Sequence, residues 1–470
     1  MEEGNKVRII GKKIALLAVV AMVAACSSSA VTTAPSSAPV SQAPGTSQAA
    51  ATTVPSAAPA TCTTLTVWAM SGSLTDAVAS TLNTEFEKAH PGCVVNYQVQ
   101  QWGGIVNKLT TALASNNPPD VFEMGNTQAV TFEAADALAD LTSSRAMLGG
   151  GTSNVSGDPG QAWLASLNDA SMYNGKLLAV PFYAGDRVLI YRTDLFATSK
   201  IDPATITSKD KLIAAAKKLQ ADNASVKDFS GLYLPGQNWY ALIQMIWDNG
   251  GQIATQANGT WTASLSSPAS QKGIQDYVDY YAAGSTGPKD NDEANPQQNT
   301  LFQQGKIGMY IGNGWEIAGS IGTTGAVTKA TQVAAMPIPS INDGKTVPVF
   351  LGGSVIGIPK NDKNMQAALD WVAQLSTPTG QNLEIGIGEI PSLKTYAANI
   401  ADTPANATLK IQAAEAAAAS GFTPNAKGWA AVEANNPLKA MLTAILTKQA
   451  TVDAAAKAAD TKVSAVINGQ

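Results

Sequence analysis

Few side chains in this sequence have the types and spacing that enzymatic chemistry requires. Glu123, Asp186 and Glu316 supply carboxylates for glycoside hydrolysis, which needs two of them about 5–10 Å apart across a cleft. With 35 acidic residues in the chain, however, a pair is easily proposed by chance. The only histidine, His90, precedes Pro91-Gly92 in a predicted surface turn, which leaves no material for a histidine triad. No zinc-ligand cluster or P-loop motif occurs, and we expect neither a metal nor a cofactor.

A second group of side chains follows predicted strands and suits ligand binding. Residues 70–73, 101–103 and 125–128 each come after an apolar strand-like run. In α/β sheets, ligands bind beyond the carboxyl ends of the strands. We therefore expect four ligand-binding residues here: Ser71, Trp102, Asn126 and Thr127. The competing interpretation is local, because serines such as Ser71 and Ser73 also cap helices and Gly-Asn is also a turn signal.

Alternating strand and helix patterns position these residues. Strand-like runs occupy 65–69, 94–99 and 120–124, and apolar residues spaced for one helical face occur between them, at 74, 78, 82 and 86 and at 105, 109 and 113. This alternation predicts an α/β fold with a mostly parallel sheet covered by helices. A second αβ region begins near residue 176. Residues 62–470 are too many for one ordinary core and predict more than one domain.

Two cysteines precede the first two predicted strands. If those strands are parallel neighbours, Cys62 and Cys93 lie side by side and a disulfide is geometrically possible. Closing about 30 residues would stabilise the fold by about 3–4 kcal/mol on the chain-entropy model. Free thiols are the alternative.

The first 25 residues are typical of an export signal. A basic stretch with Lys6, Arg8, Lys12 and Lys13 precedes 12 apolar residues at 14–25, too few to span a bilayer. Val-Ala-Ala-Cys at 23–26 resembles a bacterial lipobox, which predicts lipidation of Cys26 after cleavage. An ordinary signal peptide with a chance cysteine is the alternative. In an exported, oxidising setting the two remaining cysteines then form an even pair.

Residues 26–61 are expected to be a disordered tether. They consist almost entirely of Ser, Ala, Pro, Thr, Val and Gln, with no charged residue and no bulky aromatic group. Such a segment buries too little apolar surface to offset its ordering entropy, and its prolines keep it extended. A processed pro-segment is the alternative.

The charge of the chain points to an uncharged ligand. The formal net charge is −5, only 14% of residues are charged, and no basic stripe occurs. This argues against nucleic acid as a partner.

Short motifs follow one another in a specific order across residues 62–470. They are Leu-Thr-Val-Trp at 65–68, Pro-Pro-Asp-Val-Phe at 118–122, Gly-Asn-Thr at 125–127, Tyr-Arg-x-Asp-Leu-Phe at 191–196, Phe-Gln-Gln-Gly-Lys at 302–306, Trp-Glu at 315–316 and Gly-Ser at 353–354. In this order the chain resembles the family 1 extracellular solute-binding proteins, the carbohydrate-type relatives of maltose-binding protein. Each motif alone is weak, and their collinearity carries the resemblance.

The resemblance implies a two-lobed periplasmic-binding-protein fold of the Venus flytrap kind. Lobe 1 would comprise 62–186 and 352–392, and lobe 2 would comprise 188–350 and 394–470. Crossing segments would fall near 186–188, 350–354 and 391–396. The ligand would bind between the lobes, and hinge closure would follow binding.

The resemblance also implies aromatic contacts to the ligand. Sugars present flat C–H patches and a rim of hydroxyls, which aromatic faces and planar polar groups match. Trp315 corresponds to a family turn whose indole stacks on the ligand. Trp239 and Tyr240 open a helix that faces the cleft, one expected to bind and the other to pack, and Trp429 falls in the last cleft segment. Core packing is the alternative for Trp315 and Trp429.

Polar contacts are expected from four further residues. Tyr183 and Asp186 lie at the first crossing, where Asp186 either binds a hydroxyl or braces the hinge. Glu316 follows Trp315, and Ser354 follows a glycine pair suited to close backbone approach.

The function implied is high-affinity capture of a sugar or oligosaccharide and its delivery to the permease subunits of an ABC importer. We expect a monomer, anchored to the cell membrane on its outer face through the lipid on Cys26. Two alternatives remain: a surface-anchored glycoside hydrolase, and the same fold binding a peptide or polyamine.

Overall fold

The predicted strands near the N-terminus form half of a six-stranded sheet. The computed structural model describes residues 62–469 except 157 and 419, so the export signal, Cys26 and the tether lie outside the described residues. The strand order is β15-β6-β14-β3-β1-β2. The strands are β1 Thr64–Met70, β2 Val94–Gln100, β3 Val121–Gly125, β6 Val180–Gly185, β14 Gly352–Gly357 and β15 Ile390–Pro391.

This first sheet is mixed. Strand β1 runs parallel to β2 and β3, as predicted. Strand β14 runs antiparallel to both β3 and β6, and β15 runs antiparallel to β6. The expectation of a mostly parallel sheet was therefore wrong, because the chain returns from the second region and enters the sheet from the opposite end.

A second, four-stranded sheet has the order β12-β7-β11-β8. Its strands are β7 Arg187–Arg192, β8 Ser230–Tyr233, β11 Ile307–Asn313 and β12 Val333–Met336. Only the pair of β8 and β11 is parallel, so this sheet is mixed as well. Three two-stranded pairs complete the strands: β4 Met172–Tyr173 with β5 Lys176–Leu177, β9 Ala254–Ala257 with β10 Thr260–Ala263, and β13 Val349–Phe350 with β16 Ser420–Gly421.

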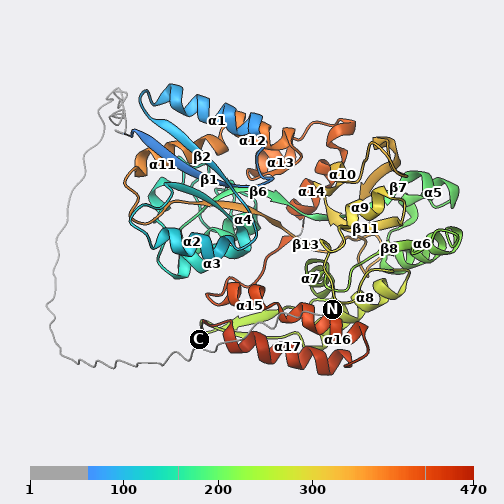
Figure 1. Cartoon of the computed structure of the whole chain (residues 1–470). Helices are drawn as coiled ribbons and strands as arrows, with labels where there is room; N and C mark the ends of the chain where they lie inside the picture. The colour runs from blue at the N-terminus through green and yellow to red at the C-terminus, as the bar shows by residue number, and fades with distance from the viewer. Residues whose placement is uncertain (1–61, 157, 419, 470) are drawn as a thin grey trace, which may run out of the picture. The chain divides into compact units, whose positions relative to one another are not determined.

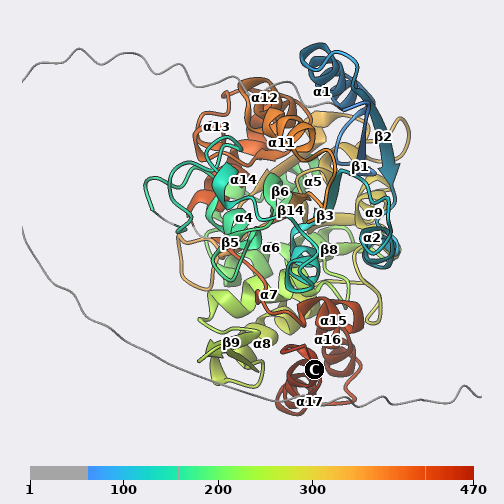
Figure 2. The same ribbon diagram turned by 90° about the vertical axis from the view of Figure 1, so that its left-hand side faces the viewer.

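Helices flank both sheets, which confirms the predicted α/β class (Figure 1). The helices of the first region and its return are α1 Asp76–Ala89, α2 Ile105–Leu113, α3 Asn126–Ala134, α4 Ala165–Ala170, α11 Met365–Ala373, α12 Pro378–Gly386 and α13 Lys394–Ala398. The others are α5 Thr193–Thr198, α6 Lys209–Asp222, α7 Trp239–Asp248, α8 Pro268–Ala282, α9 Gln298–Gln303, α10 Glu316–Gly319, α14 Ala407–Ala418, α15 Trp429–Asn435, α16 Pro437–Leu446 and α17 Val452–Val466. Helices α7 and α8 pack together, and α16 packs along α17 (Figure 2). Among the described residues, no helix has the length and apolar character needed to cross a membrane.

Helix α1 shows how the sequence pattern produces packing. Val78, Leu82 and Phe86 are buried on its inner face, as their spacing predicted. The helix is capped by Thr75, whose hydroxyl accepts from the backbone N–H of Val78 at 3.3 Å. The alternative interpretation of Ser73 as the helix cap was therefore wrong, because the hydroxyl of Ser73 is engaged elsewhere, as described below.

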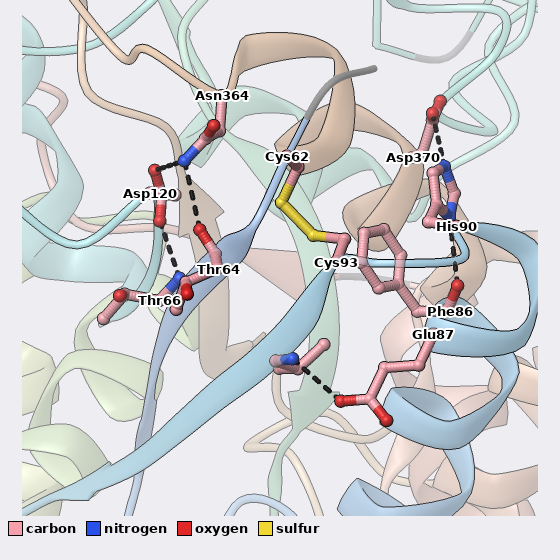
Figure 3. The surroundings of a disulfide bond; sticks show 11 residues. Cys62, Thr64, Thr66, Phe86, Glu87, His90, Cys93, Asp120, Asn364 and Asp370 are labelled. Atoms are coloured by element: carbon pink, nitrogen blue, oxygen red, sulfur yellow. Dashed lines mark hydrogen bonds and ion pairs between the residues drawn. A yellow bond between two sulfur atoms is a disulfide. The ribbon is translucent and has the colours of Figure 1, made fainter. Parts of the chain in front are cut away.

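A disulfide joins the amino-terminal ends of β1 and β2 (Figure 3). The parallel register pairs Thr64 with Val94, which brings Cys62 beside Cys93 with a Cα–Cα distance of 5.0 Å. Asp120 accepts from the backbone N–H of Thr66 at 2.6 Å and from the side chain of Asn364 at 2.8 Å, so polar bonds hold the same end of the sheet. This end lies opposite the carboxyl ends of β1 and β2.

Very short connections lead out of the first sheet and back into it. A single residue, Asp186, separates the end of β6 in the first sheet from the start of β7 in the second. On the return, only Leu351 separates β13, which pairs with β16, from β14 in the first sheet. Both connections fall within the crossing segments expected near 186–188 and 350–354, and the lobe boundaries drawn from them stay a prediction.

Candidate functional site

A cavity of about 640 Å³ lies at the carboxyl ends of β1, β2 and β3. Segments from both sheets line it, and the lining is a mixture of aromatic, small polar and a few charged side chains. The lining residues are Ser71, Gly72, Ser73, Thr75, Trp102, Gly125, Asn126, Thr127, Gln128, Tyr183, Arg187, Tyr240, Asn313, Trp315, Phe350, Gly352, Gly353, Ile387, Glu389 and Glu433.

The three segments expected beyond the strand ends meet in this cavity. Ser71, Trp102, Asn126 and Thr127 all line it. The indole N–H of Trp102 donates to the backbone oxygen of Ser71 at 3.1 Å, which joins the ends of β1 and β2. Residues 126–128 form the first turn of α3 rather than a free turn, so a helix positions them. The amide of Asn126 donates to the backbone oxygen of Leu351 at 2.9 Å and leaves its carbonyl oxygen for other partners.

Aromatic groups of the second region form the facing wall. Trp315 follows β11 with one residue, Gly314, between them, and it is 47% exposed, a large exposed fraction for an indole. Tyr240 packs against Phe350 with ring centroids 5.1 Å apart. The guanidinium of Arg187 lies 4.2 Å from the centroid of the Tyr240 ring and forms an ion pair with Glu293 at 3.1 Å. The wall therefore combines stacking surface with a neutralised cation.

A buried hydrogen-bond network supports the first wall. The hydroxyl of Ser73 donates to Glu123 at 2.6 Å and lies 3.0 Å from the hydroxyl of Tyr183. The other carboxylate oxygen of Glu123 accepts from the backbone N–H of Met70 at 2.7 Å. Burial raises the pKa of Glu123, and these hydrogen bonds oppose the shift. Glu123 thus fixes Ser73 and, through it, Tyr183.

Two further carboxyl groups face the cavity. Burial, with a smaller contribution from the charges of Glu384 and Glu123, raises the pKa of Glu389 well above its usual range. Burial also raises the pKa of Glu433, while nearby Thr127 opposes the shift. Within the described residues, one oxygen of each carboxyl group has no hydrogen-bond partner. Both pKa shifts are toward the protonated form, which donates as well as accepts.

Five expected binding residues lie behind the wall instead of on it. Trp239 and Trp429 are 3% and 1% exposed and pack on each other, with ring centroids 6.2 Å apart. Of the pair Trp239 and Tyr240, the tyrosine therefore lines the cavity and the tryptophan packs. Asp186 and Ser354 are fully buried, and the hydroxyl of Ser354 donates to that of Tyr183 at 3.3 Å. Glu316 accepts from the backbone N–H of Asn313 at 2.8 Å and so braces the turn that carries Trp315.

The carboxylates considered for hydrolysis do not face the cavity. Glu123 and Glu316 are engaged in the bonds just described, and the carboxyl group of Asp186 is enclosed beside Glu415. Burial and then the charge of Glu415 raise the pKa of Asp186 well above its usual range. In the part of the chain that the structure describes, no cluster of three or more histidine, cysteine or acidic residues gathers as metal ligands would.

Several lining residues were not expected from the sequence. Arg187, Asn313, Phe350, Glu389 and Glu433 belong to this group. Arg187 could have been identified from the sequence because it follows the crossing residue 186. Asn313 could have been identified because it lies in the turn before Trp315. Phe350 and Glu433 lie at the edges of segments already assigned to the cleft. Glu389 follows a helix with no binding pattern, and no signal in the sequence identifies it.

Two hollows of similar size lie elsewhere and suit a sugar less well. Their volumes are about 670 and 720 Å³, and both are lined around Asp136 and Lys360. The first contains one aromatic residue, Tyr173, and the second contains none. Without opposed aromatic faces they lack the lining that a sugar site needs.

Comparisons with known proteins agree with this architecture. The diacetylchitobiose binding protein DasA of Streptomyces coelicolor is 35% identical over 394 residues, covering 83% of this chain and 87% of the relative. A maltooligosaccharide ABC transporter solute-binding lipoprotein of Streptococcus pneumoniae is 25% identical over 245 residues, covering 50% of this chain and 55% of the relative. The structure of the sugar-binding protein MalE from Xanthomonas citri superimposes with a TM-score of 0.71 at 19% identity, covering 86% of this chain and 97% of that one, which shows the shared fold.

The family match covers most of the region that forms the cavity. Residues 71–382 match the model of the bacterial extracellular solute-binding proteins, which is more than half of the chain. They include the strand ends, the first crossing and the turn with Trp315. Membership implies an extracellular protein in an ABC-transport context. The chain therefore belongs to the bacterial extracellular solute-binding proteins, a family of receptors and not of enzymes.

Proposed function

We propose that this protein captures an N-acetylated amino-sugar oligomer, with N,N′-diacetylchitobiose as the first candidate, and delivers it to an ABC importer. The observation that carries the proposal is the pairing of exposed Trp315 with small polar groups across one cavity. The 35% identity to a diacetylchitobiose binding protein supports the choice of sugar.

The chemistry of the cavity suits an uncharged ligand. Burial shifts the pKa values of Glu389 and Glu433 toward the protonated form, in which a carboxyl group can donate a hydrogen bond to an acetamide or hydroxyl oxygen. Arg187 is already paired with Glu293, so an anion gains little from it. A deacetylated, cationic amino sugar would need ionised carboxylates as partners. Burial disfavours ionisation of these carboxyl groups, so binding of the cation would carry that free-energy cost.

Ligand binding is tested by calorimetry on the purified full chain. The sugars are N,N′-diacetylchitobiose, deacetylated chitobiose, maltose and cellobiose. We expect the acetylated sugar to bind most tightly and to remain intact by mass spectrometry after prolonged incubation. Conversion to monosaccharides would support the hydrolase instead, and tighter binding of maltose would contradict the choice of sugar.

The proposed mechanism is closure around the bound sugar. Helix α15 packs beside α3 (Figure 1), and Val130 of α3 shares an apolar cluster with Trp429 and Val432 of α15. A ligand that contacts both regions binds more tightly to the closed form, in which both sets of contacts exist, and so shifts the population toward that form. The permease of the importer would then recognise that form, and the receptor would act as a monomer.

We further propose attachment to the outer face of the membrane through lipid on Cys26. The lipobox-like Val-Ala-Ala-Cys motif supports it, as does the word lipoprotein in the name of the Streptococcus pneumoniae relative. Expression of Cys26→Ala in a bacterial host with metabolic fatty-acid labelling tests this. We expect the wild type to be labelled and membrane-bound and the variant to be unlabelled. Labelling of the variant would overturn the assignment.

A further inference from the structure

The indole of Trp315 meets the chain at Gly185, the last residue of β6. A Cβ atom at position 185 would lie 2.1 Å from Cζ3 of Trp315. Real Cβ atoms essentially never approach another atom closer than 3.0 Å. No residue with a side chain therefore fits at position 185 while Trp315 keeps its place.

The contact involves the edge of the indole and not its face. The same Cβ would lie 3.0 Å from Cε3 and 3.1 Å from Cη2, the two ring neighbours of Cζ3. Both distances are about 0.9 Å longer than the distance to Cζ3, as for an atom in the ring plane just outside that carbon. An atom above the ring would lie almost as close to the neighbours as to Cζ3. Gly185 thus supports the edge of the ring and leaves both faces free of this contact.

The backbone of the same turn is fixed by a second contact. A Cβ at Gly314, the residue before Trp315, would lie 2.1 Å from the side-chain oxygen of Gln412 on α14. Gln412 is buried, and its amide donates to the backbone oxygen of Asp186 at 2.8 Å. The turn and the ring are therefore both located relative to the crossing residues 185–186.

We propose that Gly185 is a positioning residue that sets the place of the Trp315 ring at the cavity wall and so determines how a sugar stacks there. This inference rests on the proposed function, because it takes Trp315 as the stacking group. A methyl group at position 185 requires the ring edge to retreat by about 1.3 Å, from 2.1 Å to the ordinary contact distance of 3.4 Å. Binding geometry tolerates displacements of about 0.5 Å, so the stack would be lost.

The variant Gly185→Ala tests the proposal, with Gly386→Ala as its matched control. Gly386 ends α12, and among the described residues a Cβ there would meet no atom within 4 Å. We expect Gly185→Ala to weaken binding of N,N′-diacetylchitobiose at least about tenfold in calorimetry, whereas Gly386→Ala leaves it unchanged. In a Trp315→Ala background, Gly185→Ala should add no further loss. Wild-type affinity of Gly185→Ala, or an equal loss in both backgrounds, would overturn the proposal.

A measurement without ligand separates this proposal from the proposed function. Fluorine NMR of protein labelled with 5-fluorotryptophan, with the Trp315 signal assigned from Trp315→Phe, reports the ring directly. We expect Gly185→Ala to shift the Trp315 signal and Gly386→Ala to leave it in place, even if no sugar in the panel binds. An unmoved signal would contradict the positioning role. If Gly185→Ala does not fold, the shorter ring in Gly185→Ala/Trp315→Phe should restore folding, and continued misfolding would also contradict it.

Discussion

At the scale of single residues, a few exposed side chains form the wall of the cavity, and neighbouring side chains of similar type are buried behind it. Trp315 keeps nearly half of its surface exposed, while Trp239 and Trp429 are buried in the core. Glu316, the residue after Trp315, accepts a hydrogen bond from the backbone of Asn313 and so stabilises the turn that carries Trp315. The position of each tryptophan therefore decides its role: Trp315 faces the cavity and is placed to bind, whereas Trp239 and Trp429 lie behind the wall and pack.

Removal of the exposed indole should abolish tight binding with little effect on folding. We expect Trp315→Ala to raise the dissociation constant for N,N′-diacetylchitobiose about 30-fold or more, since a central aromatic contact contributes about 2 kcal/mol or more. Its melting temperature should stay close to that of the wild type because the side chain is half exposed. Calorimetry and thermal unfolding check the two outcomes. Undiminished affinity would exclude Trp315 as the stacking group.

A buried hydroxyl of the first wall should contribute to stability. The hydroxyl of Tyr183 lies 3.0 Å from that of Ser73 and accepts from that of Ser354 at 3.3 Å. We expect Tyr183→Phe to lower the free energy of unfolding by about 1 kcal/mol. Urea unfolding measures the loss, and no loss would mean that the network is dispensable.

At the scale of elements, the sequence predicted strands and helices where local pattern decides them. The first three strands and the helices α1 and α2 fall within three residues of the expected positions, because alternation and helical spacing are local signals. Helix α3 was missed, since the residues around its start, Gly-Asn-Thr at 125–127, also match a turn. The direction of β14 was missed because it depends on where the chain returns from the second sheet. Likewise, the cavity residues at strand ends were expected, whereas Glu389 enters it only through tertiary packing.

Helix α3 should make the stability of the protein depend on pH. Burial raises the pKa of Glu133 to about 8, and within the described residues neither oxygen has a hydrogen-bond partner. In the unfolded chain the proton leaves near pH 4.5, so the contribution of Glu133 to the free energy of unfolding falls by about 1.4 kcal/mol per pH unit between about 4.5 and 8.

The variant Glu133→Gln should lack this part of the decline, because glutamine does not titrate. We expect its stability relative to the wild type to increase steadily from pH 5 to pH 8, by several kcal/mol in total. Urea unfolding at four pH values measures the difference, with Glu85→Gln on the exposed side of α1 as the control. A difference that stays constant with pH would contradict the buried acid.

The disulfide should stabilise the sheet without affecting binding. Cys62 and Cys93 are 31 residues apart, so Cys62→Ala/Cys93→Ala should lower the free energy of unfolding by about 3–4 kcal/mol. The dissociation constant for sugar should stay the same, because the bond lies at the opposite ends of β1 and β2 from the cavity. A large loss of affinity in the folded variant would contradict this separation.

At the scale of the whole molecule, two mixed sheets contribute to one cavity while the chain passes directly between them. This arrangement allows one ligand to contact both regions. We expect small-angle scattering to show a smaller radius of gyration for the full chain when N,N′-diacetylchitobiose is added, and no change for Trp315→Ala. A radius that is unchanged in the ligand-saturated wild type would contradict closure.

The one-residue connection at Asp186 has a geometric consequence. A connection of a single amino acid has few backbone torsion angles that can change. If one sheet rotates against the other at this point, the torsion angles of residues 185–187 must therefore accommodate the rotation. The axis of such a rotation passes close to those residues. Displacement in a rotation grows with distance from the axis. The ring of Trp315, which lies close to the axis, therefore moves little, and residues far from it move more.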